Sequence, residues 1–323
     1  MKRSLLILLL ALAMVLTFAA CGGSDEPADD AAADENGTED VADNGEAEEP
    51  EENVLEDAVN DYFANLPEDN HMIGEEEFVE KVKAGEDMVI LDIRGAESYE
   101  EAHVQGAVNL PWGTTAIADA VETIPTDKPV YLYCVTGQTA GQAVATLQTA
   151  GIDVKSVRYG MLRGIQTVEG HEAILTDEPA EMPEGQTIEV AEEIKTALQE
   201  FYANLATTEN ANNKINSEDA APLIEAGDEN YAVLSVRQEA DYAENHIEGA
   251  INIPWGAGMQ ENFDQLPKDK TIITYCYSGQ TAGQTVGGLR LLGYDAISLD
   301  SGMGTPATGD AGWMNGGFPT VSE

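Results

Sequence analysis

The sequence predicts an α/β protein with two similar domains, each built on a mostly parallel sheet with helices on both faces. The first observation is a repeat, because residues 133–141 return almost unchanged as residues 275–283, and such self-similarity indicates a duplicated domain. The second is an apolar, β-branched or aromatic run before each copy, at 129–132 and 271–274, which is typical of a buried strand. The third is the alternation of such strands with segments of helical periodicity, the pattern of a parallel sheet.

The chain begins with the pattern of an export signal over residues 1–20. Lys2 and Arg3 precede an apolar stretch that is shorter than a comfortable membrane span. Small residues then lead to Cys21 in a pattern that resembles the lipobox of bacterial lipoproteins, with Phe18 where leucine is usual. The resemblance implies that Cys21 becomes a lipidated first residue and anchors the protein to the outer face of the cytoplasmic membrane, in the cell envelope. Ordinary signal cleavage with an incidental Cys21 and an uncleaved anchor are the alternatives.

Residues 21–53 are rich in Asp, Glu, Ala, Gly and Pro, and no Lys or Arg occurs between Arg3 and Lys81. Such a segment buries too little apolar surface to fold, so it is predicted to be an acidic, disordered tether. The 323 residues carry a formal net charge of −45, which excludes a general affinity for nucleic acid and charge-driven binding to an anionic membrane. Membrane attachment is therefore expected through the lipid anchor only. Adaptation to high salt or alkaline surroundings is one interpretation of the charge.

The two predicted domains cover residues 54–180 and 181–323, with a boundary near 176–186 where prolines and a glycine mix with acidic residues. Apolar residues at helical intervals predict a helix over 54–66 that opens the first domain, and a related helix opens the second. The first domain has a further predicted helix at 75–84. The other matched segments are the strands at 88–94 and 231–237 and the motifs at 99–113 and 242–256.

In each domain the repeated loop places a cysteine, Cys134 or Cys276, where a strand ends and a helix begins. Unpaired peptide N–H groups and the positive end of the helix dipole point into such a loop, where they stabilise a thiolate and cradle an anionic group bound to its sulfur. Ligand sites of parallel α/β sheets also lie beyond the carboxyl ends of the strands. The sequence thus predicts two nucleophilic cysteines with binding loops made of Val135, Thr136, Gly137, Gln138, Thr139 and Ala140, and of Tyr277, Ser278, Gly279, Gln280, Thr281 and Ala282.

A second motif is repeated as well. The strand that ends in Asp92, Ile93 and Arg94 is followed by Tyr99, His103, Gly106 and Ala107, and the second repeat has Arg237, Tyr242, His246, Gly249 and Ala250. With the two cysteine loops, this motif resembles the tandem rhodanese-like sulfurtransferases over nearly all of the chain after the tether. The resemblance implies a rhodanese α/β fold and a cysteine that carries sulfane sulfur as a persulfide, without a metal or an organic cofactor.

Five residues are expected to support the loops: Asp92, Arg94, His103, Arg237 and His246. Each arginine is predicted to pair with a nearby carboxylate rather than to touch substrate. Each histidine is predicted to hydrogen-bond its turn rather than to act as a general base. Ser235 stands where the first repeat has Asp92, so the support of the second loop is expected to differ.

Neither loop contains a cationic side chain, although family loops often have one after the cysteine and another further on, where Thr139 and Thr281 stand here. This departure argues against efficient use of thiosulfate, a dianion. It also argues against a cysteine phosphatase, which needs an arginine to bind the phosphoryl group. A Cys134–Cys276 disulfide and inert core cysteines are the alternatives for the two thiols. Four histidines and no spare cysteine give a zinc site no support.

The predicted function is sulfur transfer from polysulfide, a persulfide or thiosulfate to a thiol, sulfite or cyanide. The alternative is a non-catalytic module that binds sulfur species or delivers sulfur to a protein partner, whose identity the sequence does not indicate. An inert adhesion or scaffold protein is a third interpretation, and it leaves the twin cysteines unexplained.

Overall fold

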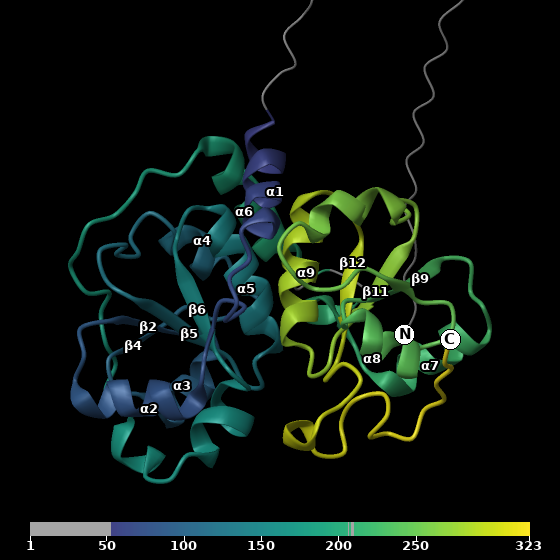
Figure 1. Ribbon diagram of the computed structural model, residues 1–323. Coiled ribbons are helices and arrows are strands. Elements are labelled where there is room, and N and C mark those ends of the chain that lie inside the picture. Colours follow the sequence, from purple (N-terminus) through teal and green to yellow (C-terminus); the bar gives the residue numbers. More distant parts are fainter. Residues whose placement is uncertain (1–52, 206, 208–209) are drawn as a thin grey trace, which may run out of the picture. The chain divides into compact units, whose positions relative to one another are not determined.

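The computed structural model describes residues 53–205, 207 and 210–323. The predicted signal peptide, Cys21 and the acidic segment up to residue 52 lie outside the described residues. The described residues form two five-stranded parallel sheets and a separate antiparallel pair of short strands (Figure 1). The prediction of two parallel α/β domains is therefore confirmed.

The first sheet has the strand order β1-β6-β5-β2-β4, and β5 occupies its centre. All four residues of β2 and of β5 are buried, as expected for strands that are covered by helices on both faces. The strands of this sheet are β1 (Met72–Ile73), β2 (Val89–Asp92), β4 (Ala107–Asn109), β5 (Val130–Tyr133) and β6 (Val154–Val157). The antiparallel pair consists of β3 (His103–Val104) and β7 (Leu175–Thr176).

The second sheet repeats this topology with the order β10-β9-β11-β12-β8, in which β11 is central. Reading it from the β8 edge gives the same succession as the first sheet, so the repeat seen in the sequence is also a repeat of topology. Its strands are β8 (Lys214–Ile215), β9 (Tyr231–Ser235), β10 (Ile251–Asn252), β11 (Thr271–Tyr275) and β12 (Ala296–Leu299).

The helices follow the same repeat. The first domain has α1 (Val54–Ala64), α2 (Glu75–Ala84), α3 (Ala96–Glu101), α4 (Ala116–Ala120) and α5 (Gln138–Thr149), and the second has α6 (Glu192–Asn204), α7 (Ser217–Glu225), α8 (Glu239–Glu244) and α9 (Gln280–Leu291). Short 3₁₀ or π-helical segments are η1 (Gly160–Gly164), η2 (Ile165–Thr167), η3 (His171–Ile174), η4 (Ala211–Asn213), η5 (Met259–Gln265) and η6 (Pro306–Thr308). Within the described part of the chain, no helix combines the length and apolar character needed to cross a membrane.

The helices that follow the two cysteine loops, α5 and α9, pack directly against each other (Figure 1). Glycines make this approach possible. A Cβ atom on Gly141 would lie 2.4 Å from the carbonyl oxygen of Gln280, and one on Gly283 would lie 2.3 Å from that of Gln138. No side chain fits at such distances, so the glycine of each repeated motif also forms the contact between the repeats.

The first helix of each domain packs on the other domain as well as on its own. From α1, the Phe63 ring meets Trp255 at 6.4 Å and Phe263 at 5.0 Å, both edge-on. From α6, the Tyr202 ring meets Trp112 at 5.6 Å, and its hydroxyl lies 2.7 Å from that of Thr146 on α5. One buried cluster therefore contains residues of both domains, among them Cys134 and Cys276, so the two cysteine loops share a core.

His71, just before β1, is a buried titratable group in this shared region. Its ring stacks on Tyr62 of α1 with 5.5 Å between centroids, and its Nδ1 lies 2.9 Å from Nε2 of Gln148. Burial lowers the pKa of His71, although the charges of Asp153 and Asp69 act to raise it.

A histidine whose pKa is lower in the folded than in the unfolded chain stabilises the fold above the unfolded pKa of about 6.5, and that stability is lost as the pH falls toward the folded value. We therefore expect His71→Asn, which places the residue of the second repeat (Asn213) in the first, to lose less stability than the wild type between about pH 7.5 and about pH 5.5. Thermal unfolding of both chains at the two pH values checks this. Equal losses would contradict it.

Candidate active site

The first cysteine loop connects the central strand β5 to helix α5. Cys134 follows Tyr133 directly, and Gly137 turns the chain into the helix with φ +95°, a conformation that favours glycine. The Cys134 Sγ accepts a hydrogen bond from the peptide N–H of Gly137 at 3.1 Å and lies 3.4 Å from the N–H of Ala140. The thiol thus lies where the unpaired N–H groups of a 12-residue helix begin.

The second loop has the same geometry between β11 and α9. Gly279 adopts φ +96°, and its peptide N–H donates to Cys276 Sγ at 3.1 Å. The cysteine carbonyls are held alike, since Met161 N donates to Cys134 O at 2.8 Å and Met303 N donates to Cys276 O at 2.9 Å. The two cysteines therefore have equivalent backbone settings, each with its Sγ at the start of a helix.

Both cysteines are free thiols, so the disulfide that the sequence left open does not form. Cys134 and Cys276 are 3% and 2% exposed. Cys276 lines a cavity of about 320 Å³. Both domains line this cavity: Cys276, Ser278 and Thr281 come from the second, and Asn70, Met72, Arg158 and Tyr159 come from the first.

The sequence predicts both glutamines as members of the binding loops, and the structure gives their side chains a further task. Gln138 crosses to the second domain, where its Nε2 donates to the carbonyl oxygen of Leu299 at 3.0 Å and its Oε1 accepts from Ser301 N at 3.2 Å. Gln280 crosses the other way and accepts from Tyr159 N at 3.0 Å. Each loop is therefore fixed partly by the domain that does not contain it. The remaining predicted loop residues lie in the two loops or in the first turns of α5 and α9. They are Val135, Thr136, Thr139, Tyr277 and Ala282, together with those named above.

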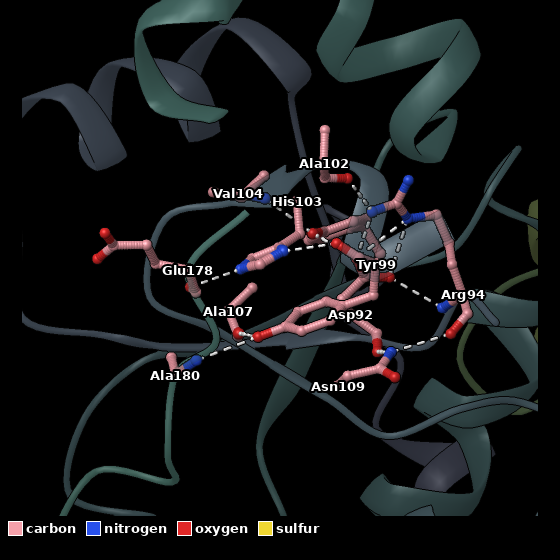
Figure 2. Close-up of polar contacts among 11 residues, drawn as sticks. Asp92, Arg94, Tyr99, Ala102, His103, Val104, Ala107, Asn109, Glu178 and Ala180 are labelled. Carbon is pink, nitrogen blue, oxygen red and sulfur yellow. Dashed lines mark hydrogen bonds and ion pairs between the residues drawn. The ribbon is translucent and has the colours of Figure 1, made fainter. Parts of the chain in front are cut away.

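Asp92 is the centre of a buried network beside the first loop (Figure 2). Arg94 donates to Asp92 through Nε at 3.0 Å and Nη2 at 2.6 Å, and Tyr133, the residue before Cys134, donates its hydroxyl at 2.7 Å. Burial acts to lower the pKa of Arg94, but the hydrogen bond and charge of Asp92 outweigh it and the pKa is raised. Burial, with the nearby charge of Asp92, also raises the pKa of Tyr133 well above its usual value. The network ties the end of β5 to the end of β2.

The second domain lacks this ion pair, so the prediction of a carboxylate partner for Arg237 is wrong. Because Ser235 replaces the aspartate, Arg237 Nη1 donates instead to the carbonyl oxygen of Asn245 at 2.7 Å and to its side-chain oxygen at 3.1 Å. Its guanidinium also lies over the Tyr277 ring, 5.2 Å from the centroid, and so contacts the loop directly. Among the described residues Arg237 forms no ion pair within 4.0 Å.

The histidines hold the turns that precede β4 and β10. His103 Nδ1 lies 2.7 Å from the carbonyl oxygen of Tyr99, and Nε2 lies 3.0 Å from that of Glu178, while the ring stacks on Tyr99 (Figure 2). His246 Nδ1 lies 2.9 Å from the carbonyl oxygen of Tyr242 and stacks in the same way. These contacts are those of structural residues.

Sequence reasoning missed one pair of residues that fixes the same region. Asn109 Nδ2 donates to the carbonyl oxygens of Asp92 and Arg94 at 2.8 and 2.9 Å, and Asn252 makes the equivalent bonds in the second domain. Both asparagines lie at the same place in the repeated motif. The recurrence of a polar residue at the end of a strand was the sequence signal that could have identified them.

We expect Asp92→Ser, which gives the first domain the residue of the second, to lower the free energy of unfolding by about 3 kcal/mol, because Arg94 is left buried without its carboxylate. Ser235→Ala is the matched control and should cost less, about 2 kcal/mol at most, since only two neutral hydrogen bonds are removed, one from Arg237 N and one with the Tyr275 hydroxyl. Urea denaturation measures both. A cost for Asp92→Ser no larger than that of the control would contradict the role given to the ion pair.

Comparison with known proteins places this geometry in a family. The Rhodanese-like domain model matches residues 75–164 and 218–304, together more than half of the chain. Thiosulfate sulfurtransferase GlpE of Coxiella burnetii is 32% identical over 85 residues, which cover 26% of this chain and 75% of GlpE. The protein YqhL of Bacillus subtilis is 37% identical over 62 residues, 19% of this chain and 48% of YqhL.

Among solved structures, SseA of Escherichia coli, described as a 3-mercaptopyruvate sulfotransferase, is 20% identical, with 72% of this chain and 98% of SseA covered and a TM-score of 0.33. The alignments span less than half the length of the Bacillus subtilis relatives YrkF and YqhL, at 44% and 48%. With the family model matched twice and the same strand order in both halves, this chain belongs to the rhodanese-like family and carries two rhodanese-like domains in tandem.

Proposed function

We propose that this chain moves sulfane sulfur through a persulfide on Cys134, on Cys276 or on both. The family match and the likeness to GlpE support sulfur transfer as the general chemistry. The observation that carries the proposal is the position of each Sγ at a helix start, 3.1 Å from the peptide nitrogen of Gly137 or Gly279. Such donors stabilise the thiolate before the reaction and the negative outer sulfur after it.

The reaction consists of two displacements on sulfur. The cysteine thiolate attacks the outer sulfur of the donor, an S–S bond forms to the cysteine, and the donor's own bond breaks with its electron pair leaving on sulfite, a thiol or a shorter polysulfide. The acceptor then attacks the outer sulfur of the persulfide and the cysteine leaves as thiolate. A cyanide acceptor yields thiocyanate, sulfite yields thiosulfate, and a thiol yields a persulfide. The loop amides and the hydroxyls of Thr136, Thr139, Ser278 and Thr281 are the groups that hold the outer sulfur.

Steady-state turnover tests this proposal. The full chain is supplied with polysulfide or thiosulfate as donor and cyanide as acceptor, and thiocyanate is counted per chain. We expect many equivalents of thiocyanate, because the persulfide is regenerated after each transfer. One or two equivalents followed by arrest would support the non-catalytic alternative, and no thiocyanate with any donor would contradict both.

One observation favours the alternative, a module that delivers sulfur to a protein partner. Val135 and Leu162 are 42% and 53% exposed, and they lie together because Leu162 N donates to Val135 O at 2.9 Å. Exposed apolar side chains directly beside Cys134 are suited to contact with another protein. A partner thiol that takes the sulfur from Cys134, but not from a Val135→Asp, Leu162→Asp chain, would establish it.

The site of action that we propose is the outer face of the cytoplasmic membrane, with Cys21 lipidated. Support comes from the sequence of residues 1–21. Mass spectrometry of the mature N-terminus should show diacylglycerol on Cys21, and Cys21→Ser should move the chain from the membrane to the soluble fraction. A mature chain without lipid would remove the anchor from the account.

A further inference from the structure

The two repeats differ in charge at one equivalent position beside the active sites. Arg158 follows β6, and its peptide N–H donates to Ile73 O at 3.0 Å; Asp300 follows β12, and its N–H donates to Ile215 O at 2.7 Å. Since β6 pairs with β1 as β12 pairs with β8, these two residues have the same place in their sheets. An arginine in one domain thus corresponds to an aspartate in the other.

Arg158 supplies a cation to a loop that has none of its own. It lines the same cavity as Cys276, although it belongs to the first domain. Its side chain is 49% exposed, and its ion pair with Glu75 is long, with 4.0 Å between Nε and Oε2. The Nη groups of Arg158 therefore keep donors for a ligand in the cavity.

The corresponding aspartate has a different setting. Asp300 forms an ion pair with Lys214 Nζ at 3.2 Å and accepts a hydrogen bond from Ser301 Oγ at 3.3 Å. Lys214 stands at the position of Met72, which lines the Cys276 cavity. Lys214 is therefore paired closely with its own neighbour, at 3.2 Å, whereas the ion pair of Arg158 in the Cys276 cavity is longer, at 4.0 Å.

We propose that Arg158 binds the anionic end of the sulfur donor at Cys276 and makes this site, rather than that of Cys134, the one that accepts doubly charged donors such as thiosulfate. This inference rests on the proposed function. Cys276 thiolate attacks the outer sulfur of thiosulfate, the new S–S bond forms, and the old S–S bond breaks with its electron pair leaving on sulfite. Arg158, which lines the same cavity as Cys276, binds the sulfonate oxygens through its guanidinium before the bond breaks and the sulfite dianion after it.

Two donors of similar shape and different charge test the proposal. Thiosulfate is a dianion, and methanethiosulfonate is a monoanion that gives the same persulfide and releases methanesulfinate. In a Cys134→Ser background, the rate of persulfide formation at Cys276 is followed by alkylation and peptide mass spectrometry. We expect Arg158→Gln to lower the rate with thiosulfate about tenfold or more, and the rate with methanethiosulfonate about threefold or less, because a charge interaction is lost from a partly enclosed site.

Arg163→Gln is the matched control, since Arg163 donates to Ser301 Oγ at 2.9 Å and does not line the cavity of Cys276; it should leave the ratio of the two rates unchanged. Arg158→Lys keeps the charge and should restore most of the ratio. An equal fall with both donors, or no fall in Arg158→Gln, would overturn the role of Arg158 while the proposed function stands. Absence of persulfide at Cys276 in the parent chain with both donors would instead sink sulfur transfer at that site.

Discussion

A chain with both Cys134→Ser and Cys276→Ser should lose sulfur transfer by at least about 1,000-fold. A serine hydroxyl is not ionised near neutral pH and forms no persulfide, so the same loop amides then surround a group that cannot carry sulfur. The measurement is thiocyanate formation from polysulfide and cyanide by the full chain. The fold should be retained, because the substitution changes one atom in each loop.

The single variants and Cys21→Ser are the controls. Each single variant reports the share of the other site, and Cys276→Ser should remove most of the activity with thiosulfate if Arg158 acts as inferred. Cys21→Ser should keep the full rate in detergent. Substantial activity in the double variant would end the assignment of either cysteine as nucleophile.

Gly283→Ala should destabilise the protein by about 3 kcal/mol or more. The new methyl group would lie 2.3 Å from the backbone carbonyl oxygen of Gln138, so α5 and α9 have to separate. This cost exceeds the gain of about 1 kcal/mol that alanine brings to a helix interior. Because both cysteine loops begin these helices, sulfur transfer should fall together with stability.

Gly256→Ala is the control for this variant, since a Cβ atom there meets nothing within 4 Å. It should change the free energy of unfolding by less than about 0.5 kcal/mol. Urea denaturation of the two chains, with the transfer rate measured in parallel, gives both readouts. A Gly283→Ala chain as stable as the control would contradict the close helix contact.

Much of the fold could be predicted from the sequence because it depends on local patterns. The central strands were indicated by the apolar runs before Cys134 and Cys276, and α5 and α9 by the helical spacing after the repeated loop. The structure has these elements in the expected order. The predicted helix at 75–84 coincides with α2. These features follow from periodicity and turn chemistry, which act over a few residues.

What could not be predicted are the contacts between the repeats. Periodicity shows that one face of α5 is buried, but not that α9 covers it, and Gly141 is equally compatible with a loop motif. The loops contain no cation, and the sequence therefore argues against thiosulfate. Arg158 of the first domain lines the Cys276 cavity, a placement that only the tertiary structure gives. The wrong prediction for Arg237 also concerns a tertiary contact. Ser235 replaces the aspartate of the first repeat, so the local motif contained no carboxylate that could be named as the partner of Arg237.

The most direct measurement is intact-mass spectrometry of the chain after brief exposure to polysulfide, followed by peptide mapping. If the peptide amides of the two loops hold a negatively charged outer sulfur, the chain gains one or two sulfur atoms, these map to Cys134 and Cys276, and an acceptor thiol removes them. A chain that gains no sulfur at either position, or gains it only at Cys21, would contradict the account.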